Sequence, residues 1–512
     1  MRASRSRLGL LAAGLSLSLA LTACSGGDTG TNPSASGKSG GNLVVGVTSD
    51  PDTLFPWKAT QFQAVNVIEQ MYDTLTKFDK DLNVVPGLAE SWQVSEDGLS
   101  VTMKLRQGVT YADGSTFDSA DVKKSLDLIK DEKTAAVSRA SLATVESVEA
   151  TDPATVTLKL TTPDAALLSN LATANMAILS SDDTEEKLNT TPNGTGPFTL
   201  KERKASQSIT LAKNDKYWGG APKVDTVEFR IIPDESSIVS ALQSNNVNLA
   251  VLNDPAVAKT AEASVPVAKT PQLSYHVLQL NARKGALTDV NVRLAMQCAI
   301  DRDQVLQTAA LGEGEVIGPI TSPAFKSDPK ARPCPTRDIA KAKDYLAKSG
   351  KQNVTVKTIV SQGEYATSVN EAQNLKAQLA EAGITLEIEV LESGAFVDRW
   401  VAADFEAAVA LNGGRPDPDG MYGRYFTSKG NLNKVAGYSS PELDKLFAEG
   451  KKSTDKAERE KIYADVSKQL EDNAVWIWLF SSYNYTATTT STKGFVPMAN
   501  NSMMSLKDVT VA

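Results

Sequence analysis

LQLNARKGALTDVNVRLAMQCAIDRDQV, residues 278–305, is the stretch that decides the fold. Its start belongs to a short strand over residues 276–280, where side chains alternate between two faces. Asp289 is a suitable N-cap for a following helix, because its carboxylate can accept a hydrogen bond from an unpaired amide of the first turn. The pattern predicts that this helix closes around Asp301-Arg302. Its buried face repeats at i, i+3, i+4 and i+7 and consists of Val292, Ala295, Met296 and Ala299.

A β-α-β pattern follows the central stretch. Residues 354–360 read as a strand, 367–382 as a helix and 384–391 as a second strand, an arrangement typical of parallel sheets. Near the end of the chain, residues 474–480 read as a short apolar strand. The fold class expected from this alternation is α/β.

Length and composition describe an ordinary globular chain. With 512 residues, two or three domains are expected. The chain is 41% apolar and 22% charged, and its formal net charge is -8. An acidic chain without basic clusters argues against nucleic acid as a partner.

The N-terminus differs from the rest in character. Three arginines precede the apolar run Leu8–Leu21, which predicts a secretory signal peptide over residues 1–23 and is too short for a membrane span. The string Leu21-Thr22-Ala23-Cys24 resembles a bacterial lipobox, in which the signal is cut before the cysteine and the thiol is acylated. A lipid on Cys24 would hold the protein at a membrane without spanning it. The alternative is a chance cysteine after a signal peptide.

Residues 24–41 are predicted to be a lipidated, flexible tether, because Gly, Ser, Thr and Asn dominate from Ser25 to Gly41. Two further cysteines remain in the mature chain, Cys298 on the central helix and Cys334 in a proline-punctuated loop. In an oxidising exterior such a pair often forms a disulfide. Two free thiols are the alternative.

Several short strings occur in a characteristic order along the chain. Together with the central stretch they resemble the extracellular solute-binding proteins of family 5, the peptide, nickel and oligosaccharide receptors that feed ABC importers. The resemblance spans about residues 42 to 500. The strings are TLFPW (53–57), MYDTL (71–75), GTGPF (194–198), NDKYWGG (214–220) and VEFRII (227–232).

The resemblance implies a periplasmic-binding-protein-like type II fold. Such a fold has two α/β lobes joined by two chain crossings, with a third domain inserted in the first lobe. Lobe I is expected to comprise residues 42–81, 196–275 and 486–512. The inserted domain would be residues 82–195 and lobe II residues 276–485.

No enzymatic constellation is visible. The single histidine, His276, lies in the strand near a predicted crossing and reads as a hydrogen-bonded strand side chain rather than a catalytic base. The sequence has no nucleophile elbow, zinc-protease motif or phosphate-binding loop. The cysteines are wrongly spaced for zinc, so neither a metal site nor a cofactor is expected.

A binding site is expected in the loop over residues 410–420, because it follows a buried strand and contains three glycines and two prolines. Ligands of α/β folds tend to bind where strands end. An ordinary surface loop is the alternative, and Asp417 could simply cap the turn. The candidate ligand-binding residues are Asn412, Arg415 and Asp417 from this loop, and the aromatic residues Trp57, Phe62, Trp400, Tyr422, Tyr425 and Tyr483.

In peptide-binding members of the family, the matching loop carries a tryptophan and then an aspartate that pairs with the peptide's amino terminus. Aligning on the shared Asp417-Pro418 places Leu411 and Gly414 at those two positions. Glycine cannot supply the charge-assisted hydrogen bond that an ammonium group needs. Capture of a peptide in the usual way is therefore not expected, and Arg415 and Asp417 offer a different polarity, for instance to a ligand carboxylate or to sugar hydroxyls.

The resemblance implies an extracytoplasmic substrate-binding protein of an ABC importer, lipid-anchored to the outer face of the cell membrane. It would capture an oligopeptide or similar small solute between two closing lobes and deliver it to a permease and its ATPase subunits. A monomer that touches the membrane only through the Cys24 lipid is expected. The alternative is the same fold binding an oligosaccharide, glycoside or metal chelate. Two further alternatives belong to other functional classes: an enzyme that uses this fold, and a sensory or chaperone-like surface lipoprotein.

If Cys24 carries the lipid, Cys24→Ser should move the protein from the membrane fraction to the supernatant, since the acyl chains provide the attachment. Detergent-phase partitioning of the two proteins measures this, with Ser25→Ala as the control. Retention of Cys24→Ser at the membrane would contradict the prediction.

Overall fold

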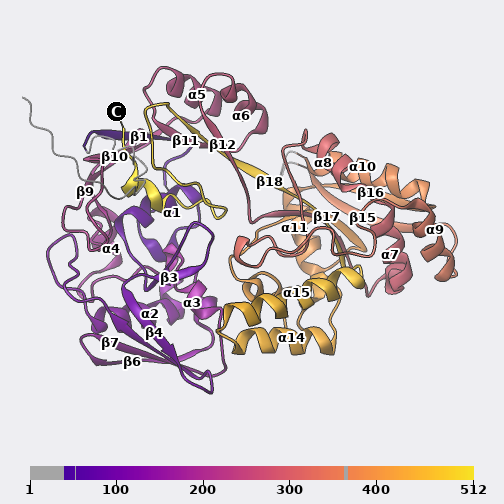
Figure 1. Cartoon of the computed structure of the whole chain (residues 1–512), viewed down its shortest axis with the longest axis horizontal. Coiled ribbons are helices and arrows are strands. Elements are labelled where there is room, and N and C mark those ends of the chain that lie inside the picture. The colour runs from indigo at the N-terminus through magenta and orange to yellow at the C-terminus, as the bar shows by residue number, and fades with distance from the viewer. Residues whose placement is uncertain (1–39, 52, 363–366, 512) are drawn as a thin grey trace, which may run out of the picture. The chain divides into compact units, whose positions relative to one another are not determined.

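The computed structural model describes residues 40–51, 53–362 and 367–511. Cys24, the predicted signal peptide and most of the predicted tether lie outside the described residues. Within the part that is described, no helix combines the length and hydrophobicity that a membrane span needs. The α/β fold class is confirmed, because strands and helices alternate along most of the chain (Figure 1).

One sheet contains 12 strands. Its members are β1 (Asn42–Val47), β8 (Phe198–Lys204), β9 (Ser208–Lys213), β10 (Thr226–Ile231), β11 (Leu249–Leu252), β12 (Val267–Pro271), β13 (Tyr275–Leu280), β14 (Gly314–Val316), β15 (Val354–Gln362), β16 (Ile384–Glu392), β17 (Ala407–Asn412) and β18 (Trp476–Thr488). The main order is β16-β15-β17-β13-β18-β11-β1-β10-β9-β8, and β12 and β14 also pair with β18. The strands of predicted lobe II that pair with β18 thus lie along its first half, and those of predicted lobe I lie along its second half.

Two small sheets belong to the N-terminal third of the chain. They are the pair β2 (Thr76–Phe78) and β3 (Val84–Pro86), and the order β4-β5-β7-β6, formed by β4 (Ala89–Val94), β5 (Ser100–Leu105), β6 (Val145–Asp152) and β7 (Thr155–Leu160). The helices are α1 (Phe62–Met71), α2 (Ser119–Lys130), α3 (Leu167–Asn170), α4 (Glu185–Thr190), α5 (Glu235–Gln243), α6 (Pro255–Glu262), α7 (Val290–Ala299), α8 (Arg302–Ala309), α9 (Ile339–Lys348), α10 (Ser368–Glu381), α11 (Ser393–Ala402), α12 (Arg424–Phe426), α13 (Asn433–Ala436), α14 (Pro441–Lys452) and α15 (Lys456–Asp472).

Strand β18 is longer than the sequence predicts. The predicted end near Phe480 is wrong, because the strand continues to Thr488. Its first half pairs with β13 and β14, and its second half pairs with β11 and β12. Hydrogen-bond partners on both sides explain the extension, since a strand persists where its backbone groups are paired.

The chain between β12 and β13 runs beside the middle of β18. The amide of Gln272 donates to the carbonyl of Ser482 at 3.0 Å. The Ser481 hydroxyl donates to the carbonyls of Gln272 at 2.6 Å and Ser274 at 2.8 Å. The two places where the chain passes from one group of strands to the other are therefore hydrogen-bonded to each other.

The central stretch forms β13 and two helices. Asp289 accepts from the amide of Asn291 at 2.9 Å, as expected of an N-cap. The predicted end of the helix is wrong by two residues: α7 stops at Ala299, because Ile300 has extended backbone angles. Asp301 then caps a separate helix, α8, by accepting from the amide of Gln304 at 2.9 Å.

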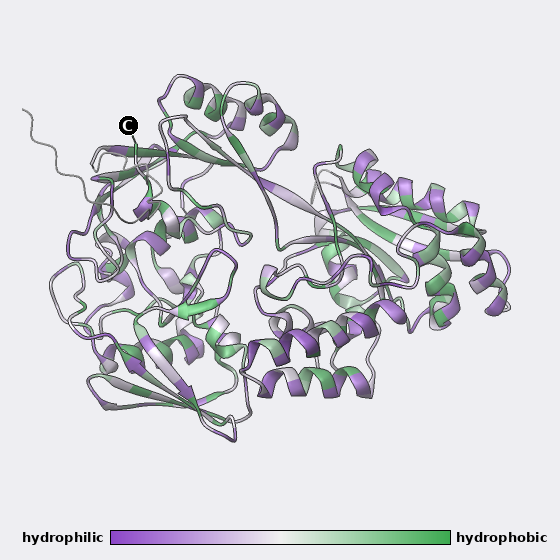
Figure 2. Cartoon of the chain, in the orientation of Figure 1, coloured by the Kyte–Doolittle hydropathy of each residue, from purple (hydrophilic) through white to green (hydrophobic). Residues whose placement is uncertain are grey.

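The β15-α10-β16 unit has the predicted parallel pairing. Helices α7, α9 and α10 bury their apolar faces against this half of the sheet, and the core there includes Leu278, Val292, Leu375 and Val409. Figure 2 shows where apolar and polar residues lie: green is frequent along the strands, and purple is frequent on helices such as α14 and α15. The strand that contains His276 is buried on both faces.

His276 has hydrogen-bond partners at both ring nitrogens. Its Nδ1 lies 2.9 Å from Glu371 Oε1, and its Nε2 lies 2.9 Å from Ser482 Oγ. Its ring stacks on Phe480 with centroids 4.1 Å apart. These contacts fit the reading of a strand side chain at the crossing.

The GTGPF string holds the end of α1 in place. A Cβ at Gly194 would lie 2.0 Å from the carbonyl oxygen of Met71, so only glycine allows this approach. The buried carboxylate of Asp73, just beyond α1, accepts from Thr195 at 3.0 Å and from Trp218 at 2.7 Å, and it pairs with Lys77 at 2.5 Å. Motifs far apart in sequence thus meet at one carboxylate.

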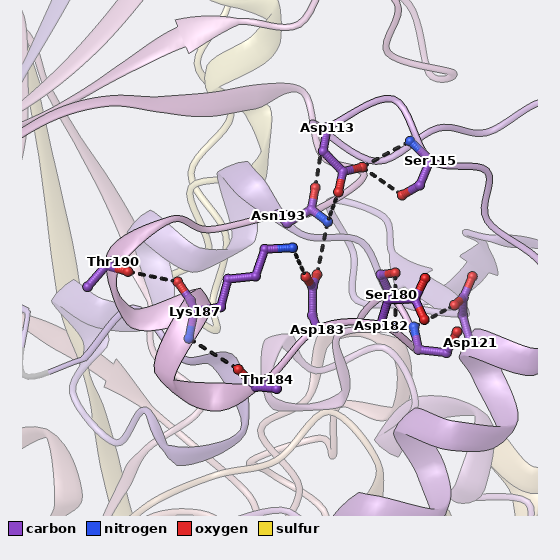
Figure 3. Close-up of polar contacts among 11 residues, drawn as sticks. Asp113, Ser115, Asp121, Ser180, Asp182, Asp183, Thr184, Lys187, Thr190 and Asn193 are labelled. Carbon is purple, nitrogen blue, oxygen red and sulfur yellow. Dashed lines mark hydrogen bonds and ion pairs between the residues drawn. The ribbon is translucent and has the colours of Figure 1, made fainter.

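The four-stranded sheet shares a hydrophobic core with α1, β1 and β10, so the predicted inserted domain packs directly on predicted lobe I. A polar network holds the C-terminal end of the predicted inserted domain in place (Figure 3). The Asn193 amide donates to Asp113 and Asp183 at 2.9 Å each, and Lys187 pairs with Asp183. The described carboxylates of this network are paired with donors of the chain itself, and no metal-binding group of His, Cys, Asp or Glu is found among the described residues.

Cys298 and Cys334 are both buried and are joined by a disulfide, with their Cα atoms 5.1 Å apart. The bond connects α7 to the loop that precedes α9. It closes a loop of 36 residues, which restricts the unfolded chain.

Cys298→Ala and Cys334→Ala should each lower the free energy of unfolding by about 2–4 kcal/mol, because either change opens the same loop. The double variant should lose no more than the worse single variant. Denaturant unfolding measures the losses, and non-reducing peptide mapping shows the linked peptides. Losses that add in the double variant, or two alkylatable thiols in the native protein, would contradict the bond.

Candidate functional site

A cavity of about 330 Å³ collects residues from six separate parts of the chain. Helix α1 forms one wall, and residues 172–175 of the predicted inserted domain form another. The crossing residues 272–274, the loop after β17, Phe78 of β2 and residues 499–504 complete the lining. Its volume lies at the lower end of the range for small-molecule sites. Residues from both predicted lobes meet here.

One face of α1 points into the cavity. It consists of Phe62, Val65, Asn66 and Glu69, at i, i+3, i+4 and i+7. Phe62, a predicted ligand-binding residue, is 62% exposed, which is unusual for so large an apolar side chain. An aromatic face, an amide and a carboxylate therefore lie in a row along the wall.

Glu69 is held by the C-terminal segment. Its carboxylate accepts from the hydroxyl of Ser502 at 2.7 Å and from the amide of Met503. Burial raises the pKa of Glu69 to about 7, although the bonds from Ser502 and Met503 and the charge of Lys77 act in the opposite direction. Lys77 forms its own ion pair with Asp73.

The loop after β17 approaches the crossing very closely. Gly414 lies against Leu273, and a Cβ at residue 414 would be 1.9 Å from the Leu273 carbonyl oxygen. The same carbonyl accepts from the Thr321 hydroxyl. The position that carries the aspartate in peptide-binding members thus has no room for any side chain in this backbone.

A second cavity, of about 210 Å³, lies on the other side of Pro416. Asp417, a predicted ligand-binding residue, is on its lining but is 5% exposed and forms an ion pair with Arg459 at 2.8 Å. Its other oxygen accepts from the amide of Asp419 at 2.9 Å. The carboxylate of Asp417 therefore stabilises the turn and pairs with a buried cation.

Three other predicted residues lie in the core of predicted lobe II. Tyr422 is fully buried and accepts from Trp478 Nε1 at 2.8 Å, while its hydroxyl donates to the carbonyl of Pro319. Tyr425 packs edge-on against Trp476 with centroids 5.1 Å apart. Asn412 is buried at the end of β17 and donates to the Tyr275 hydroxyl at 3.2 Å.

The remaining predicted residues are dispersed. Trp57 is buried and donates to the carbonyl of Ala177 at 2.9 Å. Trp400 donates to Gln279 Oε1 at 2.6 Å, and Tyr483 lies on β18 beside Tyr485. Arg415 is exposed on the loop. Of the nine predicted side chains, Phe62 reaches the first cavity and Asp417 the second.

A larger cavity, about 800 Å³, is a groove between residues 319–333 and helix α15. Every residue that lines it belongs to predicted lobe II, so closure of two lobes does not enclose it. A binding site that operates by closure requires contributions from both lobes. The smaller cavity beside α1 meets that requirement.

Several lining residues were not among the predicted ones, including Asn66, Glu69, Gln272 and Ser502. Polar residues at i+4 and i+7 of a helix normally indicate its solvent face. The only sequence signal was the odd placement of Phe62 on that same face. The C-terminal segment carried no signal, because its position depends on tertiary contacts.

Comparisons with known proteins agree on a family. The model for bacterial extracellular solute-binding proteins, family 5, middle region, matches residues 83–433. The oligopeptide-binding protein AppA of Bacillus subtilis is 30% identical, with 97% of each chain aligned. The probable di/tripeptide-binding protein 5 of Pseudomonas aeruginosa is 31% identical over 83% of this chain and 87% of its own. The structure of AgaA from A. tumefaciens with agropinic acid is 27% identical, covers 92% of this chain and 99% of its own, and superposes with a TM-score of 0.72.

Gly414→Ala should lower the free energy of unfolding by about 1–3 kcal/mol, because the added methyl group collides with the Leu273 carbonyl. Gly413→Ala is a matched control, since a Cβ there meets no atom within 4 Å. Its loss should stay within about 0.5 kcal/mol. Denaturant unfolding compares the two, and equal losses would contradict the close approach.

Proposed function

Because this chain belongs to the bacterial extracellular solute-binding proteins of family 5, which are receptors of ABC importers for peptides or similar solutes, we propose that it captures a short peptide between two lobes. The captured peptide is then delivered to the permease, and the ATPase subunits of the importer supply the energy. The receptor is a monomer held at the outer face of the cell membrane by a lipid on Cys24.

The observation that carries this proposal is the composition of the cavity beside α1. Phe62 and Asn66 come from predicted lobe I, whereas Gly414 and Pro416 come from predicted lobe II. A solute in this cavity contacts both. Closure is favoured only to the extent that the solute binds the closed form better than the open form. Contacts from both lobes provide that difference in affinity.

The crossings supply the axis for such a motion. Residues 272–274 line the cavity and are hydrogen-bonded to Ser481 and Ser482 in the middle of β18. A rotation there changes few contacts of either half of the sheet, because each half has its own core. The proposed hinge and the proposed binding site are therefore adjacent.

The volume of about 330 Å³ favours a solute of di- or tripeptide size. The walls support a peptide-like solute, since apolar side chains alternate with amide and hydroxyl groups. Those groups can pair with peptide N–H and C=O groups, whose burial without hydrogen bonds is costly.

A second candidate is a non-peptide solute such as an oligosaccharide, glycoside or metal chelate. The closed position at Gly414 favours it, because the usual partner of a peptide's amino terminus is absent. The likeness to AgaA, a protein described in complex with agropinic acid, is a precedent within similar structures.

Denaturation of the purified full-length protein should release a mixture of short peptides, identifiable by mass spectrometry. Phe62→Ala should bind those peptides about 5- to 30-fold more weakly, because an exposed aromatic contact in the cavity is lost. Val137→Ala is the control, as another exposed apolar side chain that does not line this cavity. Release of one sugar or chelate would contradict the peptide proposal and support the second candidate.

A further inference from the structure

Glu69 is the one charged side chain among the described residues that line the cavity beside α1. The other polar groups of the lining are amides and hydroxyls of residues such as Asn66, Gln272 and Ser274. No described lysine or arginine forms an ion pair with Glu69, and the ammonium of Lys77 is already paired with Asp73. The cavity therefore has one carboxylate, and this carboxylate has no ion-pair partner among the described residues.

The carboxylate of Glu69 is oriented but not saturated. A carboxylate has about four lone-pair sites. The Ser502 hydroxyl takes one on Oε2, and the Met503 amide and the Gln70 side chain, the latter at 3.5 Å, share Oε1. At least one acceptor site therefore remains on Oε2 of a residue that lines the cavity and whose carboxylate is oriented by the C-terminal segment.

We propose that the Glu69 carboxylate binds a primary ammonium group of the solute, so that the receptor selects peptides with a free amino terminus. This inference rests on the proposed function and names its ligand class more narrowly. A charge-assisted hydrogen bond to a carboxylate in a low-dielectric cavity is strong and selective. The group supplies, from another part of the same lining, the charge that Gly414 cannot provide.

The electrostatics of the cavity support this assignment. Burial raises the pKa of Glu69 to about 7, so removal of this carboxylate from water outweighs the hydrogen bonds and the charge of Lys77 that favour its ionised form. The Ser502 and Met503 groups that contact it do not titrate near neutral pH, and Lys77 is the charged residue whose field reaches it. A bound ammonium group would favour the ionised form.

A structural role is the competing explanation, in which Glu69 only ties the C-terminal segment to α1. Glu69→Gln separates the two roles, because the amide oxygen can still accept from the Met503 amide and the amide NH2 can donate to the Ser502 hydroxyl, whereas the charge is lost. Ser502→Ala does the opposite, since it removes the hydrogen bond to Glu69, together with the one that Ser502 accepts from the Met504 amide, and keeps the charge. Glu202→Gln, an exposed carboxylate on β8, is the matched control for the loss of one charge.

The probes are an equimolar library of tripeptides with free amino termini and the same library N-acetylated. Native mass spectrometry measures the binding of each library to the full-length protein and its variants. The wild type should prefer the free library by about 10- to 100-fold. Glu69→Gln should abolish that preference, whereas Ser502→Ala and Glu202→Gln should keep it.

The affinity of the wild type for the free library should fall as the pH drops from 7.5 to about 5.5, because protonation neutralises a carboxylate whose pKa is about 7. Glu69→Gln should lack this fall. His276 is present in both proteins, so their difference isolates Glu69.

The outcomes distinguish two failures. If the wild type binds both libraries equally, or if Glu69→Gln keeps the preference, the receptor function stands and the role of Glu69 is overturned. Equal loss of all binding in Glu69→Gln and Ser502→Ala likewise overturns it, in favour of a structural role. If the wild type binds neither library, the peptide function itself fails, and the inference about Glu69 fails with it.

Discussion

The hydrogen bonding of β18 is the constraint on which the rest of the structure depends. This one strand pairs with β13 and β14 through its first half and with β11 and β12 through its second half. It therefore joins two groups of strands, each packed on a separate core. The other chain crossing, residues 272–274, is hydrogen-bonded to the middle of β18. The crossing, the proposed hinge and one part of the cavity lining therefore occupy the same place.

Much of this arrangement was predictable from local patterns. The N-cap of α7, the parallel β15-α10-β16 unit and the spacing of the family strings depend on residues close in sequence, and the structure has them as expected. The predicted end of α7 was wrong, because Ile300 has extended backbone angles. The predicted length of β18 was wrong, because residues 481–488 pair with strands that are distant in sequence. The residues of the candidate site were harder to predict, since the type of a residue does not tell whether its side chain points into the core or into a cavity. Tyr422 and Tyr425 pack in a core, whereas Phe62 lines a cavity.

Two parts of the cavity lining differ in whether they can supply a charged side chain. Leu273 approaches the loop so closely that residue 414 has no space for a side chain, so a charge cannot come from that wall. Helix α1 supplies the carboxylate of Glu69, which has no ion-pair partner among the described residues. Glu69 stands at the end of the helix face that begins with Phe62. The end of α1 is held by Asp73 and the GTGPF string, so this face has a defined position. A motif that lies outside the cavity lining thereby positions the residues that we propose contact the solute.

A crystal structure of the protein with its co-purified solute tests the central claim most directly. Solute density is expected in the cavity beside α1, in contact with Phe62 on one side and with the loop at Gly414–Pro416 on the other, and with a nitrogen of the solute within hydrogen-bond distance of Glu69. Density in the groove between residues 319–333 and α15 would contradict the account, because that groove is built from one lobe alone.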